Sequence, residues 1–179
     1  MVSTKLIGKL FVSRQKEIDQ YATQAEAIQE RVFRKLIQTA AATEWGTKYN
    51  YANIRTYNDF KHVPIQQYDD IKGYVDRMRH GEKNILWPGQ VVWYAKSSGT
   101  TNDKSKFIPV SKDGLHHIHY QGGTDAVALY LRSNPQSNFF SGKGLILGGS
   151  HSPNYNLKDS LVGDLSAILI QNINPLVNF

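Results

Sequence analysis

The chain has 179 residues, of which 40% are hydrophobic and 20% are charged. This composition is typical of a soluble globular protein with a real core, and it argues against a disordered chain. The net charge of +6 is spread out: 14 lysines and arginines face 10 acids in residues 1–90, and 7 face 5 in residues 91–179. Without a basic block or a known nucleic-acid-binding module, we predict no nucleic-acid partner.

The apolar runs are too short for a membrane partner, because a membrane span needs about 18 consecutive apolar residues. Lys5, Lys9 and Arg14 interrupt the apolar runs near the N-terminus, which argues against a secretory signal. The absence of cysteine excludes disulfides and thiolate metal sites. These features are compatible with the cytoplasm, where we expect the protein.

The first half of the chain is predicted to be mainly helical. Apolar residues recur at three- to four-residue spacing from Ala25 to Ala40, which indicates an amphipathic helix. A shorter helix is predicted before it, over residues 6–11, and Gly46 is expected to end the helical pattern. Another helix is predicted from Tyr68 to Arg79, with Gly81 as its stop.

The second half has a different composition, with 12 charged residues against 24 in the first half and 9 glycines against 5. This shift favours buried strands and tight turns. We expect strands at Val91–Ala95 and Phe107–Val110, and a short buried strand at Leu145–Leu147. The chain is therefore predicted to be an α/β protein, mainly helical over residues 1–90 and strand-containing over residues 91–179.

Two further helices are predicted in this half. One begins near Lys112 and runs to about Leu131, and Gly122-Gly123 in its middle indicates either a helix break or a close approach of something to the backbone. Asp164 or Ser166 is suited to cap a last apolar helix.

A polar run from Ser97 to Lys106 separates the first two predicted strands. It combines hydroxyls, one glycine and two lysines, which together suit phosphate: hydroxyls and backbone N–H groups donate, glycine permits close approach, and lysine supplies charge. The run is also longer than the usual hairpin connection. It is not a Walker-type loop, because the second glycine followed by Lys and Ser/Thr is missing. The alternative interpretation is an ordinary polar loop, since Ser, Thr, Asn, Asp and Gly are common in loops and the lysines would then be exposed to solvent.

The order of these residues is more specific than their composition. Ser97-Ser98-Gly99-Thr100-Thr101, followed by Lys106, resembles the first nucleotide motif of adenylate-forming enzymes. Within that superfamily the chain is most similar to the auxin-responsive promoter family of acyl acid amido synthetases, and in particular to its bacterial-type members. The similarity continues in the segments Phe107–Ser111, Val162–Leu169 and Pro175–Phe179.

The resemblance implies N-terminal helices followed by part of the large mixed-sheet domain of adenylate-forming enzymes. It also implies ATP and Mg²⁺ as cofactors, and a small-molecule carboxylic acid and an amine or amino acid as partners. The matching phosphate-binding residues are Ser97, Ser98, Gly99, Thr100, Thr101 and Lys106. His119, Tyr120 and Gly123 fall where the family binds the acyl acid. We predict no metal site formed by protein ligands, since His116 and His119 have no acidic or thiol partner at helical spacing.

Several family features are not found in this sequence: the second motif ending in a Ser-Glu pair, the ribose-binding aspartate motif and the small C-terminal domain. We therefore expect an N-terminal fragment, a single incomplete domain, that is inactive alone. As a whole protein it would adenylate a carboxylate with ATP and form an amide. The alternative is a non-catalytic module that binds an anion or nucleotide, or a basic interaction protein.

Overall fold

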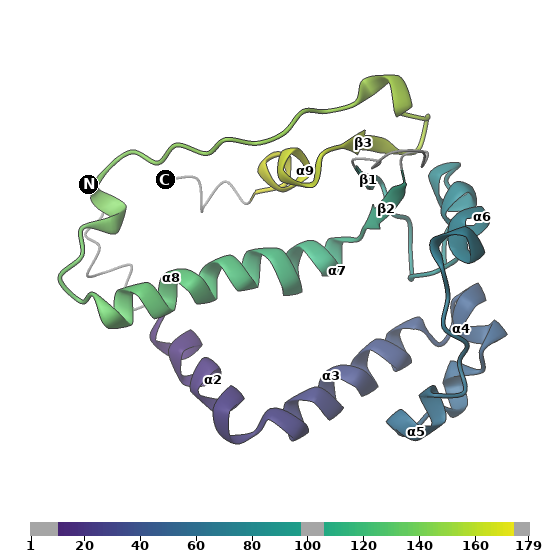
Figure 1. The fold of residues 1–179 in the computed structure, drawn as a ribbon, viewed down its shortest axis with the longest axis horizontal. Helices are drawn as coiled ribbons and strands as arrows, with labels where there is room; N and C mark the ends of the chain where they lie inside the picture. Colours follow the sequence, from purple (N-terminus) through teal and green to yellow (C-terminus); the bar gives the residue numbers. More distant parts are fainter. Residues whose placement is uncertain (1–10, 98–105, 174–179) are drawn as a thin grey trace.

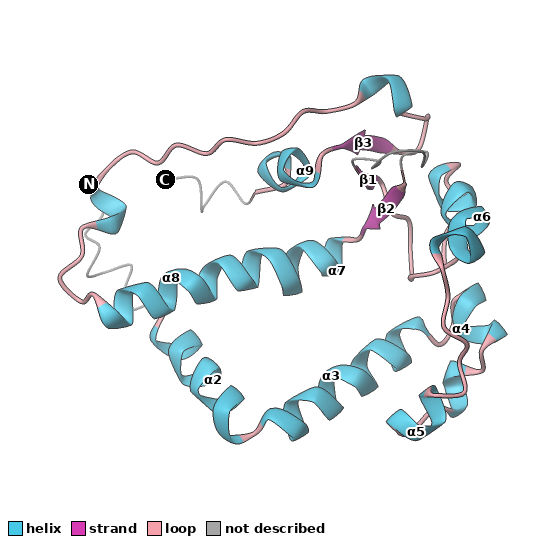
Figure 2. Cartoon of the chain, in the orientation of Figure 1, coloured by secondary structure: helices cyan, strands magenta, loops and turns pink. Residues whose placement is uncertain are grey.

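The structure, a computed structural model, describes residues 11–97 and 106–173. Helices dominate the first part of the chain, and a small sheet with further helices follows, which confirms the predicted α/β class (Figures 1 and 2). None of the helices in the described ranges is long and apolar enough to cross a membrane. The shorter helical turns are η1 (Tyr51–Asn53), α5 (Tyr57–Phe60), η3 (Phe139–Ser141) and η4 (Pro153–Tyr155).

The first two described helices are α2 (Val12–Thr23) and α3 (Ala25–Ala40). The bounds of α3 confirm the helix predicted from apolar spacing, and its buried residues Ile37 and Ala40 lie near its C-terminal end. The helix predicted over residues 6–11 lies almost wholly outside the described residues. Figure 1 shows α2 reaching up to α8 while α3 runs to the opposite side of the molecule.

The prediction that Gly46 ends a helix is wrong. The preceding helix already ends at Ala40, and Gly46 lies within α4 (Glu44–Lys48), which Thr43 caps with its side chain. A Cβ atom at position 46 would lie 2.0 Å from the carbonyl oxygen of Ala40. Glycine is therefore required here for the close approach of α4 to the end of α3.

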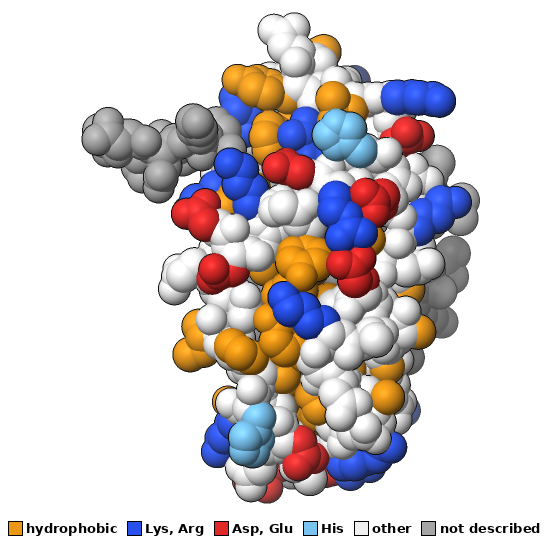
Figure 3. Space-filling model, turned by 90° about the vertical axis from the view of Figure 1, so that its right-hand side faces the viewer, with side chains coloured by type: hydrophobic (Ala, Val, Ile, Leu, Met, Phe, Trp, Pro, Cys, Tyr) orange, Lys and Arg blue, Asp and Glu red, His pale blue; other side chains and the backbone are white. Residues whose placement is uncertain are grey.

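Helix α6 (Tyr68–Arg79) has the predicted bounds and forms one side of the main core. Asp70 and Gln67 complete a capping box at its start, and Gly81 follows its end with a positive φ of 94°, as expected of a glycine stop. The buried residues that pack together are Val75, Met78, Ile85, Val91, Tyr94 and Val162. The surface on this side of the molecule mixes acidic and basic side chains rather than gathering one sign (Figure 3).

The sheet has three strands in the order β2-β1-β3. Strands β1 (Trp93–Lys96) and β2 (Phe107–Val110) are antiparallel, whereas β1 and β3 (Leu161–Gly163) are parallel, so the sheet is mixed as predicted. Tyr94 on the middle strand has no exposed surface. Helices α6 and α9 lie on either side of the strands (Figure 1).

The long helix predicted after the second strand is present and continuous in direction, but it changes type along its length. It comprises α7 (Lys112–Gly114), a π-helical segment η2 (Leu115–Tyr120) and α8 (Gln121–Ser133). Gly122-Gly123 does not break it, and a Cβ atom at either glycine would meet no atom of the described residues within 4 Å. Of the two alternatives for this glycine pair, the helix break is therefore wrong.

The short buried strand predicted at Leu145–Leu147 is also wrong. This segment belongs to an extended connection that runs along the outside of the molecule from α8 towards β3 (Figure 2). Leu145 and Leu147 are 84% and 85% exposed. An apolar run becomes a buried strand only where a partner covers it, and no strand in the described part of the chain pairs with this one.

The last described helix, α9 (Leu165–Gln171), has Asp164 at its N-cap position, but the Asp164 side chain forms no capping hydrogen bond to the helix. Residues at the start of α9 also form hydrogen bonds to the end of the extended connection. The side chain of Asp164 accepts a hydrogen bond from the backbone of Ser150 (2.9 Å), and Ser166 accepts one from Gly149 (2.8 Å). A Cβ atom at Gly149 would lie 2.2 Å from the Asp164 carboxylate, so glycine permits this contact.

Candidate functional site

The polar run predicted to bind phosphate connects the two strands of a hairpin, and its two ends are held together. The backbone N–H of Ser97 donates to the carbonyl of Lys106 (3.0 Å), and the backbone N–H of Lys106 donates to the Ser97 hydroxyl (3.2 Å). The first and last of the predicted phosphate-binding residues are therefore neighbours. The other four, Ser98, Gly99, Thr100 and Thr101, lie outside the described residues.

Lys106 is held on a second side by helix α6. Its ammonium lies 5.5 Å from the ring centre of Tyr68, a distance typical of a cation–π contact. Within residues 11–97 and 106–173 no carboxylate pairs with Lys106, whereas Arg14, Arg34, Arg77 and Arg132 all have acidic partners. None of the described carboxylates therefore neutralises the charge of Lys106.

Other basic and aromatic side chains surround the base of this loop. The guanidinium of Arg79 lies 3.7 Å from the ring centre of Phe107 and donates to the backbone carbonyl of Tyr155 (2.7 Å). The Lys96 ammonium lies 4.1 Å from the ring centre of Tyr155. Three cations, Lys96, Lys106 and Arg79, thus lie around the ends of the two strands, and sequence reasoning identified only one of them.

The three residues predicted to line the acyl pocket lie on the long helix that begins at the opposite end of β2 from the loop. Tyr120, at the end of the π-helical segment, donates its hydroxyl to the carbonyl of Leu169 in α9 (3.1 Å), and burial raises its pKa. His119 is half-buried beside it, and Gly123 is exposed one turn further along. These residues share one stretch of helix.

The π-helical segment was not predicted. Such segments are rare and occur frequently at functional sites, because the wider turn redirects side chains. Here the segment includes His119 and Tyr120, and His116 packs edge-on against Tyr120 with their ring centres 5.9 Å apart. No sequence signal we know of would have found it, since the apolar spacing alone is that of an ordinary helix.

No group of three or more potential metal ligands occurs in the part of the chain that the structure describes. The histidines of the π-helical segment therefore do not form a metal site with other described residues.

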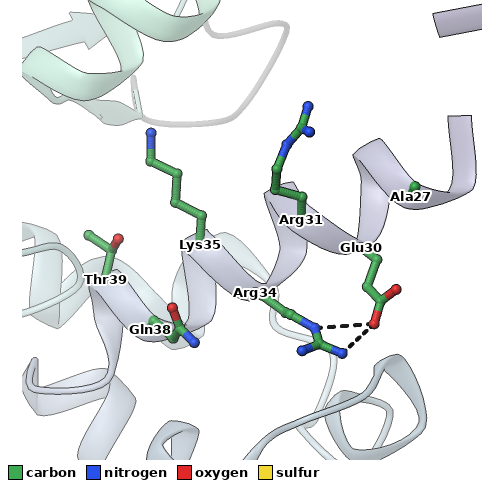
Figure 4. A pocket seen from close by; sticks show the side chains of 7 residues that line it. All are labelled: Ala27, Glu30, Arg31, Arg34, Lys35, Gln38 and Thr39. Carbon is green, nitrogen blue, oxygen red and sulfur yellow. Dashed lines mark hydrogen bonds and ion pairs between the residues drawn. The ribbon is translucent and has the colours of Figure 1, made fainter. Parts of the chain in front are cut away.

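A hollow on the described surface lies elsewhere, along helix α3, with a volume of about 600 Å³ (Figure 4). Its lining comes from this helix alone: Ala27, Glu30, Arg31, Arg34, Lys35, Gln38 and Thr39. Arg34 and Glu30 form an ion pair, while Arg31 and Lys35 extend from the other side of the helix (Figure 4). None of the predicted site residues lines this hollow, and side chains from a single helix do not enclose a binding site.

Solved structures share this fold, among them two of acyl acid amido synthetases. The chain superimposes on "GH3.15 acyl acid amido synthetase" with a TM-score of 0.72 and 19% identity, covering 96% of this chain and 30% of that one. It superimposes on "AtGH3.15 acyl acid amido synthetase in complex with 2,4-DB" with a TM-score of 0.73 and 21% identity, covering 97% of this chain and 30% of that one. The fold is therefore that of part of an acyl acid amido synthetase.

The sequence identifies the family. Residues 14–177 match the GH3 family N-terminal domain, and the chain belongs to this family. A relative from Oryza sativa subsp. indica, "Indole-3-acetic acid-amido synthetase GH3.8", is 32% identical over 106 residues, which are 58% of this chain and 18% of the relative. Another from Arabidopsis thaliana, "4-substituted benzoates-glutamate ligase GH3.12", is 24% identical over 107 residues, 59% of this chain and 19% of the relative. The chain thus spans about a fifth to a third of the length of these proteins.

Proposed function

We propose that this chain forms the N-terminal part of an ATP-dependent acyl acid amido synthetase, and that the loop between β1 and β2 binds the triphosphate of ATP. Family membership supports the enzyme class. The observation that carries the proposal for the loop is the pairing of Ser97 with Lys106, which places a lysine without a carboxylate partner in the described residues at the base of the polar run.

The proposed reaction has two steps. First, a carboxylate oxygen of the acid attacks the α-phosphorus of ATP, the bond to the β-phosphate oxygen breaks, and pyrophosphate leaves. Second, the nitrogen of an amine or amino acid attacks the carbonyl carbon of the acyl adenylate, the bond from that carbon to the phosphate oxygen breaks, AMP leaves, and the nitrogen loses a proton to give the amide. Negative charge on the phosphoryl oxygens increases in the first step, so donors fixed beside them lower its barrier.

The chain's own contribution to the first step is to bind and orient the phosphates. Lys106 supplies positive charge, and the hydroxyl and backbone groups from Ser97 to Thr101 supply donors. Mg²⁺ prefers phosphate oxygens and water to all-protein cages, so we propose that it enters with ATP. On the acyl side, we propose that His119, Tyr120 and Gly123 contact the acid.

Substitution of the loop tests this proposal in the full-length gene product. We expect Ser98→Ala combined with Lys106→Met to weaken ATP binding by about 10- to 100-fold, since hydrogen bonds to charged groups contribute about 1.5–3 kcal/mol. Isothermal titration calorimetry gives the affinity, and circular dichroism checks the fold.

Lys16→Met is the matched control, because Lys16 is an exposed lysine on α2. It should leave the affinity for ATP unchanged. Unchanged ATP binding in the loop variant, with the fold intact, would contradict the proposed role of the loop and favour a non-catalytic module.

A further inference from the structure

The first residue of β2, Phe107, is held through its backbone by a side chain from α6. The backbone N–H of Phe107 donates to the Tyr68 hydroxyl (3.0 Å), and the same hydroxyl donates to the Phe107 carbonyl (3.4 Å). A tyrosine hydroxyl can serve as donor and acceptor at once, so one group satisfies both backbone groups of the residue.

This contact supplies hydrogen-bond partners at one residue on the outer edge of the sheet. Strand β2 is the outer strand of the described sheet, and Phe107 is paired with Lys96 of β1 on its inner side. The backbone groups of an outer strand need partners from outside the sheet. Tyr68 supplies them at the residue directly after Lys106, where the chain leaves the proposed phosphate loop.

The ring of Tyr68 has a second contact, with the ammonium of Lys106 at 5.5 Å from the ring centre. The backbone of Lys106 is meanwhile tied to Ser97 through both its N–H and its carbonyl. Strand pairing thus fixes the backbone of the lysine, and Tyr68 limits the region that its charged end occupies.

Helix α6 holds Phe107 from its other end as well. Arg79, the last residue of the helix, stacks its guanidinium on the Phe107 ring at 3.7 Å and donates to the carbonyl of Tyr155. The first and last residues of one helix therefore contact the same residue of β2. A rigid helix that holds a strand end at two points restricts its movement along and across the helix.

We infer that Tyr68 is a positioning residue for the phosphate site: its hydroxyl fixes the C-terminal anchor of the loop, and its ring orients the ammonium of Lys106 towards bound triphosphate. This inference rests on the proposed function. Tyr68 itself does not contact the reacting atoms. It acts through Phe107 and Lys106, and the two parts of its side chain have separate effects.

Tyr68→Phe and Tyr68→Leu separate these effects in the full-length gene product. We expect Tyr68→Phe, which keeps the ring, to weaken ATP binding about three- to tenfold, as the loss of a hydrogen bond would. We expect Tyr68→Leu to weaken it about threefold more, because it also removes the cation–π contact. In a Lys106→Met background this second difference should disappear, since the charge that the ring orients is gone.

Tyr74→Phe is the matched control, because Tyr74 lies on the same helix and its hydroxyl accepts a hydrogen bond from Lys48 instead (3.0 Å). Hydrogen exchange of the Phe107 amide gives a readout that is independent of ATP. We expect it to be at least tenfold faster in Tyr68→Phe than in the wild type, and unchanged in Tyr74→Phe.

The outcomes distinguish the inference from the proposed function. If Lys106→Met weakens ATP binding but Tyr68→Phe does not, the inference is wrong and the proposed function stands. If the Phe107 amide exchanges at the wild-type rate in Tyr68→Phe, the anchoring role is wrong. If the difference between Leu and Phe at position 68 persists with Lys106→Met, the orienting role of the ring is wrong. If Lys106→Met leaves ATP binding unchanged, the proposed role of the loop fails, and the inference fails with it.

Discussion

Single side chains connect segments that the sequence separates, and Arg77 is one example. Its guanidinium contacts both carboxylate oxygens of Glu44 (2.7 and 2.8 Å) and the carboxylate of Glu82 (2.7 Å). Hydrogen bonds from Arg77 hold the pKa of Glu44 and the pKa of Glu82 below the usual glutamate value. The contacts among Arg77, Glu44 and Glu82 connect α4 to the C-terminal end of α6.

The lowered pKa values predict how stability depends on pH. A carboxylate whose pKa is lowered by folding stabilises the native state above its unfolded-state pKa, and this contribution is lost as the pH falls through the folded-state value. We expect Arg77→Met to lower the Tm at pH 7 by at most about 3 °C, since exposed ion pairs contribute little. The difference in Tm from the wild type should shrink below about pH 4.5. Thermal denaturation between pH 3 and pH 7 measures it, and a constant difference over this range would contradict this account.

Some single residues of the candidate site could be predicted from the sequence, and others could not. Ser97 and Lys106 were predicted from residue type and order, and the structure brings them together. Tyr68 was expected only as the first residue of a helix. Its bond to Phe107 depends on how α6 packs on β2, and no local pattern of residues encodes that packing.

Among the elements, amphipathic helices with clear ends were the most predictable. The helices Ala25–Ala40 and Tyr68–Arg79 have the expected bounds because apolar spacing, a capping residue or a following glycine marks them locally. Leu145–Leu147 was mistaken for a strand, since three apolar residues say nothing about whether a partner strand is present. Gly46 was mistaken for a helix end, although its role is a tertiary contact with Ala40.

Alanine is predicted to stabilise helix α8 at either residue of its glycine pair. Gly122 and Gly123 lie in a regular helix, and a Cβ atom at either would meet no described atom within 4 Å. Alanine at either position should therefore stabilise the folded chain by roughly 0.5–1 kcal/mol, through the higher helix propensity of alanine. Chemical denaturation measures this change.

The pair also tests the proposed acyl pocket, because the two variants differ only in their place relative to it. Gly123→Ala should weaken binding of the acid, since it adds a methyl group at a proposed contact. Gly122→Ala should leave acid binding unchanged. Equal acid affinities in both variants would place Gly123 outside the pocket, and a loss of stability in either would show that neighbouring atoms do approach the helix.

At the scale of the whole molecule, the described residues form part of a fold that is about three times longer in its solved relatives. The main core lies between α6 and the sheet, while Leu145 and Leu147 are almost fully exposed on the connection between α8 and β3. The fold class could be predicted because helical and strand-forming segments are segregated along the chain. The arrangement of α2, α3 and α8 could not, because it depends on long-range contacts such as the Arg14–Asp125 ion pair.

We propose that this chain supplies the phosphate-binding loop of an enzyme that adenylates carboxylic acids. Carboxylate-dependent exchange of labelled pyrophosphate into ATP tests it most directly, with the full-length gene product and a panel of aryl and alkyl acids. We predict exchange that requires an acid and that falls at least tenfold when Ser98 and Lys106 are replaced, which corresponds to about 1.4 kcal/mol or more in the barrier. Exchange without any acid dependence, or exchange unchanged by the double replacement, would contradict the claim.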